Sequence, residues 1–344
     1  MSGIPAALTA ALLFGVATPL AKLLLQPLDP WLLAGVLYLG SGIGLALIKA
    51  VRPGRGPGIA RRDAPWLLAA IVCGGLIAPV LLMWGLARST ASTASLLLNS
   101  EGVFTALIAW FVLRENFDRR IALGMLLIVV GAVVLAWPDA YRADATLPSL
   151  AIAGACLAWA LDNNLTRKVA LADATTIAML KGLGAGAANV TLALLANAAV
   201  PSPAEFVAAA ALGFASYGVS LVLFVSALRS LGTARTAAYF STAPFAGTLL
   251  SVGLLHEPLT WRLAIAALLM GLGVWLHLTE HHIHRHSHEA MEHEHEHEHE
   301  HDLHHTHEHD TSIAPRTRHS HWHRHEPVTH SHDHYPDAHH RHPH

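Results

Sequence analysis

The chain has 344 residues, of which 53% are hydrophobic and only 13% charged, and its mean hydropathy is +0.41. This composition is typical of a membrane protein and argues against an ordinary soluble domain. Charge divides the chain: residues 1–279 hold 17 Lys and Arg against 11 Asp and Glu, whereas residues 280–344 hold 5 against 13, with 25 of the 27 histidines. Cys73 and Cys156 lie in apolar runs and predict no disulfide framework.

Apolar stretches long enough to cross a bilayer recur along residues 1–279. The first runs on past Lys22 without a preceding basic segment, so we expect an uncleaved span and not a signal peptide. The predicted spans are 3–25, 31–51, 65–87, 90–113, 119–137, 147–170, 174–198, 203–228, 233–255 and 260–279.

These spans form an internal repeat. The pattern of residues 96–137 returns 142 positions later as 238–279, and residues 14–22 align with 159–167 at an offset of 145. At the first offset, identical residues coincide at Glu115 and Glu257, Arg120 and Arg262, and Gly131 and Gly273. Each repeat has five spans, so the chain leaves the first repeat on the opposite side of the membrane from where it began. The second repeat should therefore be inverted relative to the first.

We therefore predict an all-α polytopic membrane protein with ten transmembrane helices. Its parts are a first repeat (1–140), a second, inverted repeat (141–279) and a disordered histidine-rich tail (280–344). One set of connections carries twelve Lys and Arg residues, and the opposite set carries three, with Lys22 arguable. By the positive-inside rule, both termini should lie in the cytoplasm. We expect the membrane to be a bacterial-type inner membrane.

A short polar joint, Leu-x-Glu, links spans 4 and 5 (Leu113 to Glu115) and spans 9 and 10 (Leu255 to Glu257), and a glycine follows in the next helix. With the duplication, these residues resemble the EamA-type permeases of the drug/metabolite transporter superfamily. The resemblance covers about residues 4–279. It implies inverted repeats and gradient-driven movement of amino acids, metabolites or drugs, often outward. Arg114 and His256 stand where many members have glycine.

Three ionisable residues stand out because they lie deep inside predicted spans: Glu101, Asp162 and Lys181. Such groups are expensive in a bilayer and mark functional sites by default. The repeat aligns Glu101 with Ala243 and Asp162 with Ala17, so neither carboxylate is duplicated with the scaffold. We expect both carboxylates to line a transport pathway and exchange protons. The alternative is a fixed Asp162–Lys181 ion pair that holds helices in register.

Helical spacing adds further candidates to this pathway. Span 6 places Trp159, Asp162, Asn163 and Thr166 on one face, span 8 brings Tyr217 near Ser220, and span 9 brings Tyr239 near Thr242. The predicted substrate and proton pathway comprises Glu101, Asp162, Asn163, Trp159, Lys181, Tyr217, Tyr239 and Thr242. Structural roles are expected for the joint glutamates, Glu115 and Glu257, and membrane anchoring for Lys22 and Arg167.

Residues 280–344 are of low complexity and poor in apolar residues, which predicts disorder. Imidazoles beside carboxylates suit Zn, Ni and Co. The predicted metal ligands act collectively; they are His293, His295, His297, His299, His301, His319, His321, His323 and His325. The tail would serve as a metal buffer, a sensor that gates transport, or a pH switch. No cofactor is required.

The sequence thus predicts a secondary transporter that exports a small polar metabolite or amino-acid-like solute and carries a cytosolic metal-binding tail. The alternative is a divalent transition-metal (Zn, Ni or Co) exporter. An enzyme is not expected, because no nucleophile–base spacing or phosphate loop occurs. The expected partners are the lipid bilayer, a small-molecule substrate and divalent metal ions, without nucleic acid. The sequence defines no oligomeric state.

Overall fold

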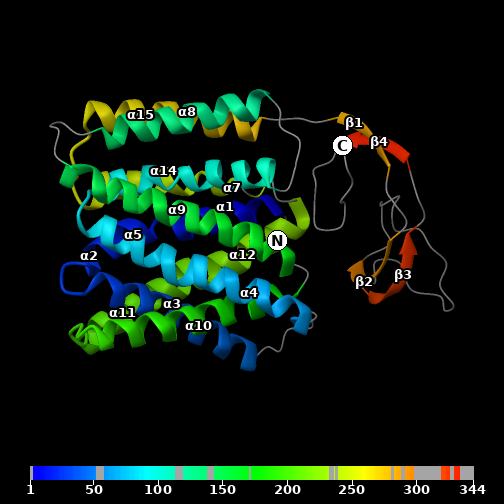
Figure 1. The fold of residues 1–344 in the computed structure, drawn as a ribbon, viewed down its shortest axis with the longest axis horizontal. Helices are drawn as coiled ribbons and strands as arrows, with labels where there is room; N and C mark the ends of the chain where they lie inside the picture. Colours follow the sequence, from blue (N-terminus) through cyan, green and yellow to red (C-terminus); the bar gives the residue numbers. More distant parts are fainter. Residues whose placement is uncertain are drawn as a thin grey trace. The chain divides into compact units, whose positions relative to one another are not determined.

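The computed structural model describes residues 3–51, 58–112, 119–137, 143–169, 172–231, 236 and 239–279, and the backbone of 283–287, 291–297, 319–325 and 329–333. The chain separates into two compact units, Met1–Glu280 and His281–His344. Every described element of the first unit is helical (Figure 1). These elements are α1 (Gly3–Gly15), α2 (Ala17–Leu24), α3 (Pro30–Val51), η1 (Arg61–Asp63), α4 (Ala64–Ala70), η2 (Ile71–Ile77), α5 (Ala78–Ala87), α6 (Ala91–Leu97), α7 (Ser100–Phe111), α8 (Arg119–Ala136), α9 (Ala143–Val169), α10 (Ala174–Leu195), α11 (Pro203–Gly213), η3 (Phe214–Val219), α12 (Ser220–Leu231), α14 (Ala243–Leu254) and α15 (Trp261–Leu278).

Within the described residues, six helical segments are long and apolar enough to cross a membrane. They are Gly3–Leu24, Pro30–Val51, Arg61–Ala87, Ala174–Leu195, Pro203–Ala227 and Trp261–Leu278. Two shorter apolar helices, Ala122–Ala136 and Ala243–Leu254, match two more predicted spans. A segment of 22 residues is about 33 Å long as an α-helix, which is enough for the hydrocarbon core of a bilayer. The ten-span count and the inversion of the second half stay predictions.

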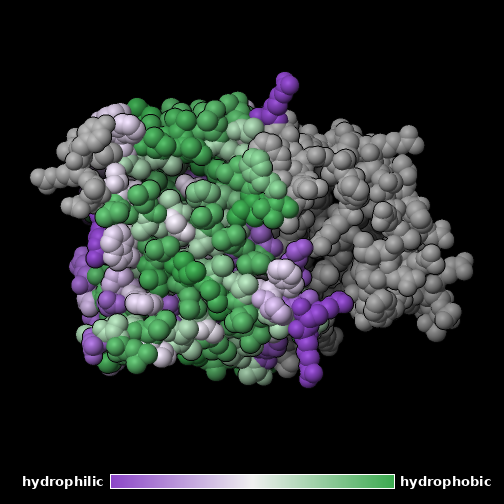
Figure 2. Space-filling model, viewed as in Figure 1, coloured by the Kyte–Doolittle hydropathy of each residue, from purple (hydrophilic) through white to green (hydrophobic). Residues whose placement is uncertain are grey.

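The surface of the helical unit is apolar where a soluble protein would be polar. Large hydrophobic side chains such as Leu195, Leu249 and Trp261 are exposed, while Asp162 and Lys181 are buried. Figure 2 shows hydrophobic residues along the sides of the helices and hydrophilic residues gathered at their ends. Such a surface matches a lipid environment, in which burying an apolar side chain brings little gain and exposing a charge is costly.

The two halves pack in a reciprocal way. Helix α5 packs on α9 as α1 packs on α12, and η2 packs on α10 as η3 packs on α3. The pairs α3–α10 and α8–α15 each join equivalent helices, and Figure 1 shows α8 beside α15. This is the pattern that a two-fold relation between the halves produces.

Hydrogen bonds at the ends of α8 and α15 repeat the same reciprocity. Arg120 donates to the carbonyl of Thr279 at 3.2 Å, and its repeat equivalent Arg262 donates to the carbonyl of Trp137 at 2.9 Å. Each arginine thus binds the carboxyl end of the helix contributed by the other half. Positive charge at a helix C-terminus also complements the helix dipole.

Close contact between helices depends on glycine at their crossings. A Cβ atom on Gly182 of α10 would lie 2.5 Å from the backbone nitrogen of Gly42 in α3. A Cβ atom on Gly273 of α15 would lie 2.5 Å from the carbonyl oxygen of Gly124 in α8. Small residues let backbones approach in membranes, where dispersion contacts replace the hydrophobic effect between helices.

Irregular turns recur at corresponding places in the halves. The π-helical turns η2 and η3 begin at Ile71 and Phe214, 143 positions apart. The predicted span 90–113 is interrupted between α6 and α7, and the predicted span 233–255 is interrupted just before α14. The helices that follow the interruptions, α7 and α14, begin at Ser100 and Ala243, which are 143 positions apart. The first interruption follows from Asn99, whose side chain donates to the carbonyl of Leu96 at 3.2 Å and competes with the helical pattern.

In the second unit, the described segments are four strands, β1 (Ile283–Ser287), β2 (Met291–His297), β3 (His319–His325) and β4 (Thr329–Asp333). Antiparallel pairs form between β1 and β4 and between β2 and β3. The alternation of His with Glu or Ser has a period of two, which is the period of a strand. The predicted disorder of the tail stays a prediction. His299 and His301 lie outside the described residues.

Candidate functional site

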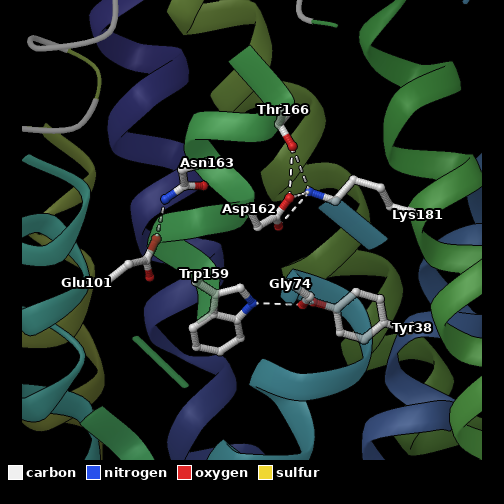
Figure 3. A network of polar contacts seen from close by, with 8 residues as sticks. All are labelled: Tyr38, Gly74, Glu101, Trp159, Asp162, Asn163, Thr166 and Lys181. Atoms are coloured by element: carbon white, nitrogen blue, oxygen red, sulfur yellow. Dashed lines mark hydrogen bonds and ion pairs between the residues drawn. The ribbon is translucent and has the colours of Figure 1, made fainter. Parts of the chain in front are cut away.

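Helix α9 carries the polar face that the sequence predicts, and it contacts three other elements through it (Figure 3). Trp159 binds η2, Asp162 binds α10 and Asn163 binds α7. These residues share one face because spacings of three and four residues return to the same side of a helix. Most of the predicted pathway residues are thereby brought to one region of the helical unit.

Asp162 forms a buried ion pair with Lys181 of α10. The Lys181 Nζ atom lies 2.6 and 2.7 Å from the two Asp162 carboxylate oxygens, and the side chains are each 6% exposed. Thr166 donates to Asp162 Oδ1 at 2.9 Å. Both charges are therefore compensated, as a buried pair requires. In this structure Asp162 follows the alternative that the sequence left open, the ion pair between helices.

Glu101 has a different environment. It lies in the first turn of α7, directly after the interruption of span 4. Asn163 donates to Glu101 Oε1 at 2.8 Å, so the second half of the chain holds a carboxylate of the first half (Figure 3). Among the described residues, no Lys, Arg or His lies within ion-pair distance of Glu101. Its position at a helix N-terminus partly stabilises the ionised form.

The π-helical turn η2 supplies backbone acceptors to this region. The carbonyl of Gly74 accepts hydrogen bonds from Trp159 Nε1 at 2.9 Å and from the Tyr38 hydroxyl at 2.7 Å. The next carbonyl, of Gly75, accepts from the Asn189 amide at 2.7 Å. A π-turn disturbs the regular i to i+4 ladder, so its carbonyls are open to side-chain donors. A Cβ atom on Gly74 would lie 1.9 Å from Asp162 Oδ2, and only glycine fits there.

An aromatic cluster lies beside the polar face. Ring centroids are 5.9 Å apart for Phe14 and Trp159, 5.8 Å for Phe14 and Tyr217, 5.2 Å for Phe14 and Phe240, and 5.2 Å for Tyr38 and Tyr217. The sequence predicted Trp159 and Tyr217 but missed Phe14, Tyr38 and Phe240. A signal for Phe14 existed, because the repeat aligns it with Trp159.

Two predicted residues of span 9 are placed differently from the expectation. Tyr239 packs against Ala6, Ala7 and Ala227, and its neighbour Phe240 takes the position in the aromatic cluster. The Thr242 hydroxyl donates to the carbonyl of Tyr239 at 2.7 Å, at the interruption before α14. Because the chain is not a regular helix here, i to i+3 spacing does not predict a shared face.

Charged residues at the helix ends cap other helices. Glu257 accepts from the backbone nitrogens of Ala91 and Ser92 at 2.7 and 2.8 Å, which confirms a structural role at a helix start. Lys22 donates to the carbonyls of Leu86, Ala87 and Ser89 at the end of α5. Lys22 therefore binds the end of a neighbouring helix, and its role as a membrane anchor stays a prediction. Glu115 and the Arg167 side chain lie outside the described part of the chain.

Within the described residues, no group of three or more His, Cys, Asp and Glu side chains lies close enough to hold a metal ion. Cys73 and Cys156 are free thiols, and the Cys156 sulfur lies 3.6 Å from the carbonyl of Leu97. No observation in the described helices favours the divalent-metal-exporter alternative.

Membrane-length helices, an apolar outer surface and buried ionisable groups define a polytopic membrane protein. The model of the EamA-like transporter family matches residues 1–137 and 146–279. The chain belongs to the EamA-like transporter family.

Similar proteins agree with this assignment. An uncharacterized transporter of Methanothermobacter thermautotrophicus (strain Delta H) is 27% identical over 287 residues, covering 78% of this chain and 84% of its own length. The uncharacterized transporter YetK of Bacillus subtilis (strain 168) is 23% identical over 122 residues, 35% of this chain and 37% of its own. A solved structure described only as a crystal structure of a protein has a TM-score of 0.63 and 21% identity, and covers 80% of this chain and 98% of its own. That likeness concerns the fold alone.

Proposed function

We propose that the protein is a secondary transporter in which two inverted five-helix halves enclose a solute path beside α9. It exports a small polar metabolite or amino-acid-like solute across a bacterial-type inner membrane, with both termini in the cytoplasm. The observation that carries the proposal is Glu101, a carboxylate of the first half that accepts a hydrogen bond from Asn163 of the second half and has no cationic partner among the described residues.

The contrast between the two intramembrane carboxylates supports a role for Glu101 in coupling. Asp162 is neutralised by Lys181, so its charge is stable without a ligand. Glu101 accepts a bond only from a neutral amide, and an uncompensated charge in a membrane interior is costly. Binding a proton or a cationic group relieves that cost. We infer that Glu101 alternates between such partners during transport.

The helix interruptions support the location of the path. In secondary transporters, discontinuous helices at corresponding positions of two repeats point to the binding site, because their ends supply free backbone groups. Here α7 and α14 begin at corresponding positions, and a Cβ atom on Gly102 would lie 3.5 Å from the Ser241 hydroxyl oxygen. The two interruptions are therefore neighbours in space, and the first is next to Glu101 in sequence.

Transport by purified protein in proteoliposomes tests the proposal. Vesicles are loaded with a pool of amines, amino acids and other polar metabolites, a pH gradient is imposed, and solute loss is measured by mass spectrometry. We expect the wild type to move at least one solute and Glu101→Gln to abolish that movement. Glu205→Gln is the matched control, because Glu205 is a half-buried capping-box residue at the start of α11 where glutamine also caps. Equal transport by Glu101→Gln and wild type contradicts the proposal.

We also propose that the histidine-rich tail binds divalent ions such as Zn, Ni or Co and modulates transport from the cytoplasm. Its composition supports this, with 25 histidines among acidic residues. The backbone register adds support: His293 lies opposite His323, His295 opposite His321 and His297 opposite His319. Neutral imidazole is a preferred ligand of these metals.

A further inference from the structure

The charges around α9 restrict what a substrate can carry. Lys181 has both oxygens of Asp162 as partners, and Lys22 binds three backbone carbonyls at the end of α5. Neither ammonium group is free to receive an anion. Glu101 is the ionisable group of this region whose partner is neutral. The described part of the site thus has a surplus of negative charge when Glu101 is ionised.

An anionic group on a substrate has little else to bind here. The N-terminus of α7 would favour an anion, but the carboxylate of Glu101 already lies in its first turn. A second carboxylate beside Glu101 would be repelled in a medium of low dielectric constant. A substrate with a carboxylate therefore loses binding energy relative to the same molecule without one.

The aromatic cluster indicates what the substrate carries besides its charged group. Trp159 and Asn163 are one helical turn apart on α9, about 6 Å along its axis. The Trp159 of the cluster with Phe14 and Tyr217 is thus about one helical turn along α9 from Asn163, whose amide donates to the Glu101 carboxylate. A two-carbon linker between an ammonium group and a ring covers roughly such a distance. Aromatic faces also attract cations.

Two hydroxyl groups give this region further capacity for hydrogen bonds. Thr105, one turn along α7 from Glu101, has a buried hydroxyl without a partner in the part of the chain that the structure describes. No hydrogen bond of the Tyr217 hydroxyl occurs within that part either, although the residue is only 8% exposed. An ammonium group has three donors, of which a carboxylate uses one or two, so neighbouring hydroxyls can accept the others.

We propose that the substrate is a monocationic amine with an aromatic or bulky apolar body and no carboxylate, held by Glu101 through its ammonium group and by the Phe14–Trp159–Tyr217 cluster through its body. This proposal rests on the transport function proposed above and narrows its substrate class. It separates arylalkylamines from the corresponding zwitterionic amino acids, which share the ring and the ammonium group but add an anion.

A matched ligand series on the full-length wild type tests the proposal without any variant. The probes are 2-phenylethylammonium, L-phenylalanine and 2-phenylethanol, and the readouts are titration calorimetry and Trp fluorescence in detergent. We expect the amine to bind about tenfold or more tightly than the amino acid and the alcohol. Equal or tighter binding of phenylalanine, or no binding of the amine, overturns the proposal.

Variants then assign the contacts. Glu101→Gln should weaken amine binding about tenfold or more and leave 2-phenylethanol unchanged, while Glu205→Gln should bind like the wild type. Trp159→Leu should weaken both probes. Unchanged amine affinity in Glu101→Gln contradicts the proposal. A third outcome separates the two proposals. If the amine does not bind but another solute is transported across the proteoliposome membrane by the wild type and not by Glu101→Gln, the transport function stands and only the substrate class is wrong.

Discussion

Asp162 and Glu101 have similar signals in the sequence but different surroundings in the structure. Both Asp162 and Glu101 are unduplicated carboxylates within apolar spans, and the sequence treats them alike. In the structure, Lys181 and Thr166 surround Asp162, whereas within the described residues the side-chain partner of Glu101 is Asn163. We therefore assign Asp162 to holding α9 against α10, and propose Glu101 as the residue that changes partner during transport.

Stability measurements separate these roles. Asp162→Asn leaves the buried Lys181 charge without its partner and should lower the free energy of unfolding by about 3 kcal/mol or more. The double variant Asp162→Asn with Lys181→Met removes both charges and should recover most of that loss. Thermal unfolding in detergent measures both. A double variant as unstable as the single one argues that the ion pair is not the interaction that Asp162 contributes.

Gly74 is a second residue-scale test. Gly74→Ala places a methyl group within 1.9 Å of Asp162 Oδ2, so either the ion pair or the π-turn must shift. We expect lower thermal stability and lost transport. Gly253→Ala in α14 is the control, because nothing lies within 4 Å of its Cβ position and alanine favours a helix by about 1 kcal/mol. Wild-type transport by Gly74→Ala would mean that this close approach is dispensable.

At the scale of the element, helix ends are stabilised by charged side chains from elsewhere in the chain. Lys22 binds three carbonyls at the end of α5. Lys22→Met should therefore cost about 1–3 kcal/mol of stability, since three partly buried carbonyls would lose a charged donor. Lys168→Met, at an exposed position of α9, is the control and should be neutral. Equal unfolding midpoints for the two variants would show that the carbonyls find other donors.

The start of α10 gives a pH prediction. Burial alone would raise the pKa of Asp173, but hydrogen bonds from Thr176 and the charge of Lys49 outweigh it and hold the pKa below its usual value. A depressed pKa contributes stability above the unfolded-state pKa of about 3.9, and this is lost as the pH falls through the folded-state pKa. Asp173→Asn, which still caps the helix, should reduce the loss of stability between about pH 5 and 3. An unchanged acid profile would assign that loss to other groups.

The elements that the sequence predicts best are those set by hydropathy and length. The spans at 3–25, 31–51 and 260–279 match helices of the structure within a few residues. The interruptions could not be read from hydropathy, because both lie inside apolar runs, and at the first one the Asn99 side chain bonds the carbonyl of Leu96. Likewise, the positions of Phe14, Tyr38 and Phe240 depend on how separate helices meet, and spacing within one helix carries no such information.

At the scale of the whole molecule, the two units call for different measurements. Replacing six tail histidines (His293, His295, His297, His319, His321 and His323) by asparagine in the full-length chain should reduce the number of Zn ions bound. The thermal midpoint without metal should stay the same, because the helical unit is a separate compact unit. Undiminished Zn binding, measured by calorimetry, would place the metal sites elsewhere.

The reciprocal packing of the halves places the coupling residue at a contact between them, since Glu101 comes from one half and Asn163 from the other. In a transporter of this kind, exchange of the partner at Glu101 biases the equilibrium between two arrangements of the halves. The central claim is therefore that solute and proton compete for Glu101.

Solute-driven proton movement tests that claim most directly. Proteoliposomes containing a pH-sensitive dye are given a pH gradient, and a transported solute is then added on one side. We predict that the solute collapses the gradient with wild type and with Glu205→Gln, but not with Glu101→Gln. Solute movement without any proton movement in the wild type, or the same collapse with Glu101→Gln, would contradict the account.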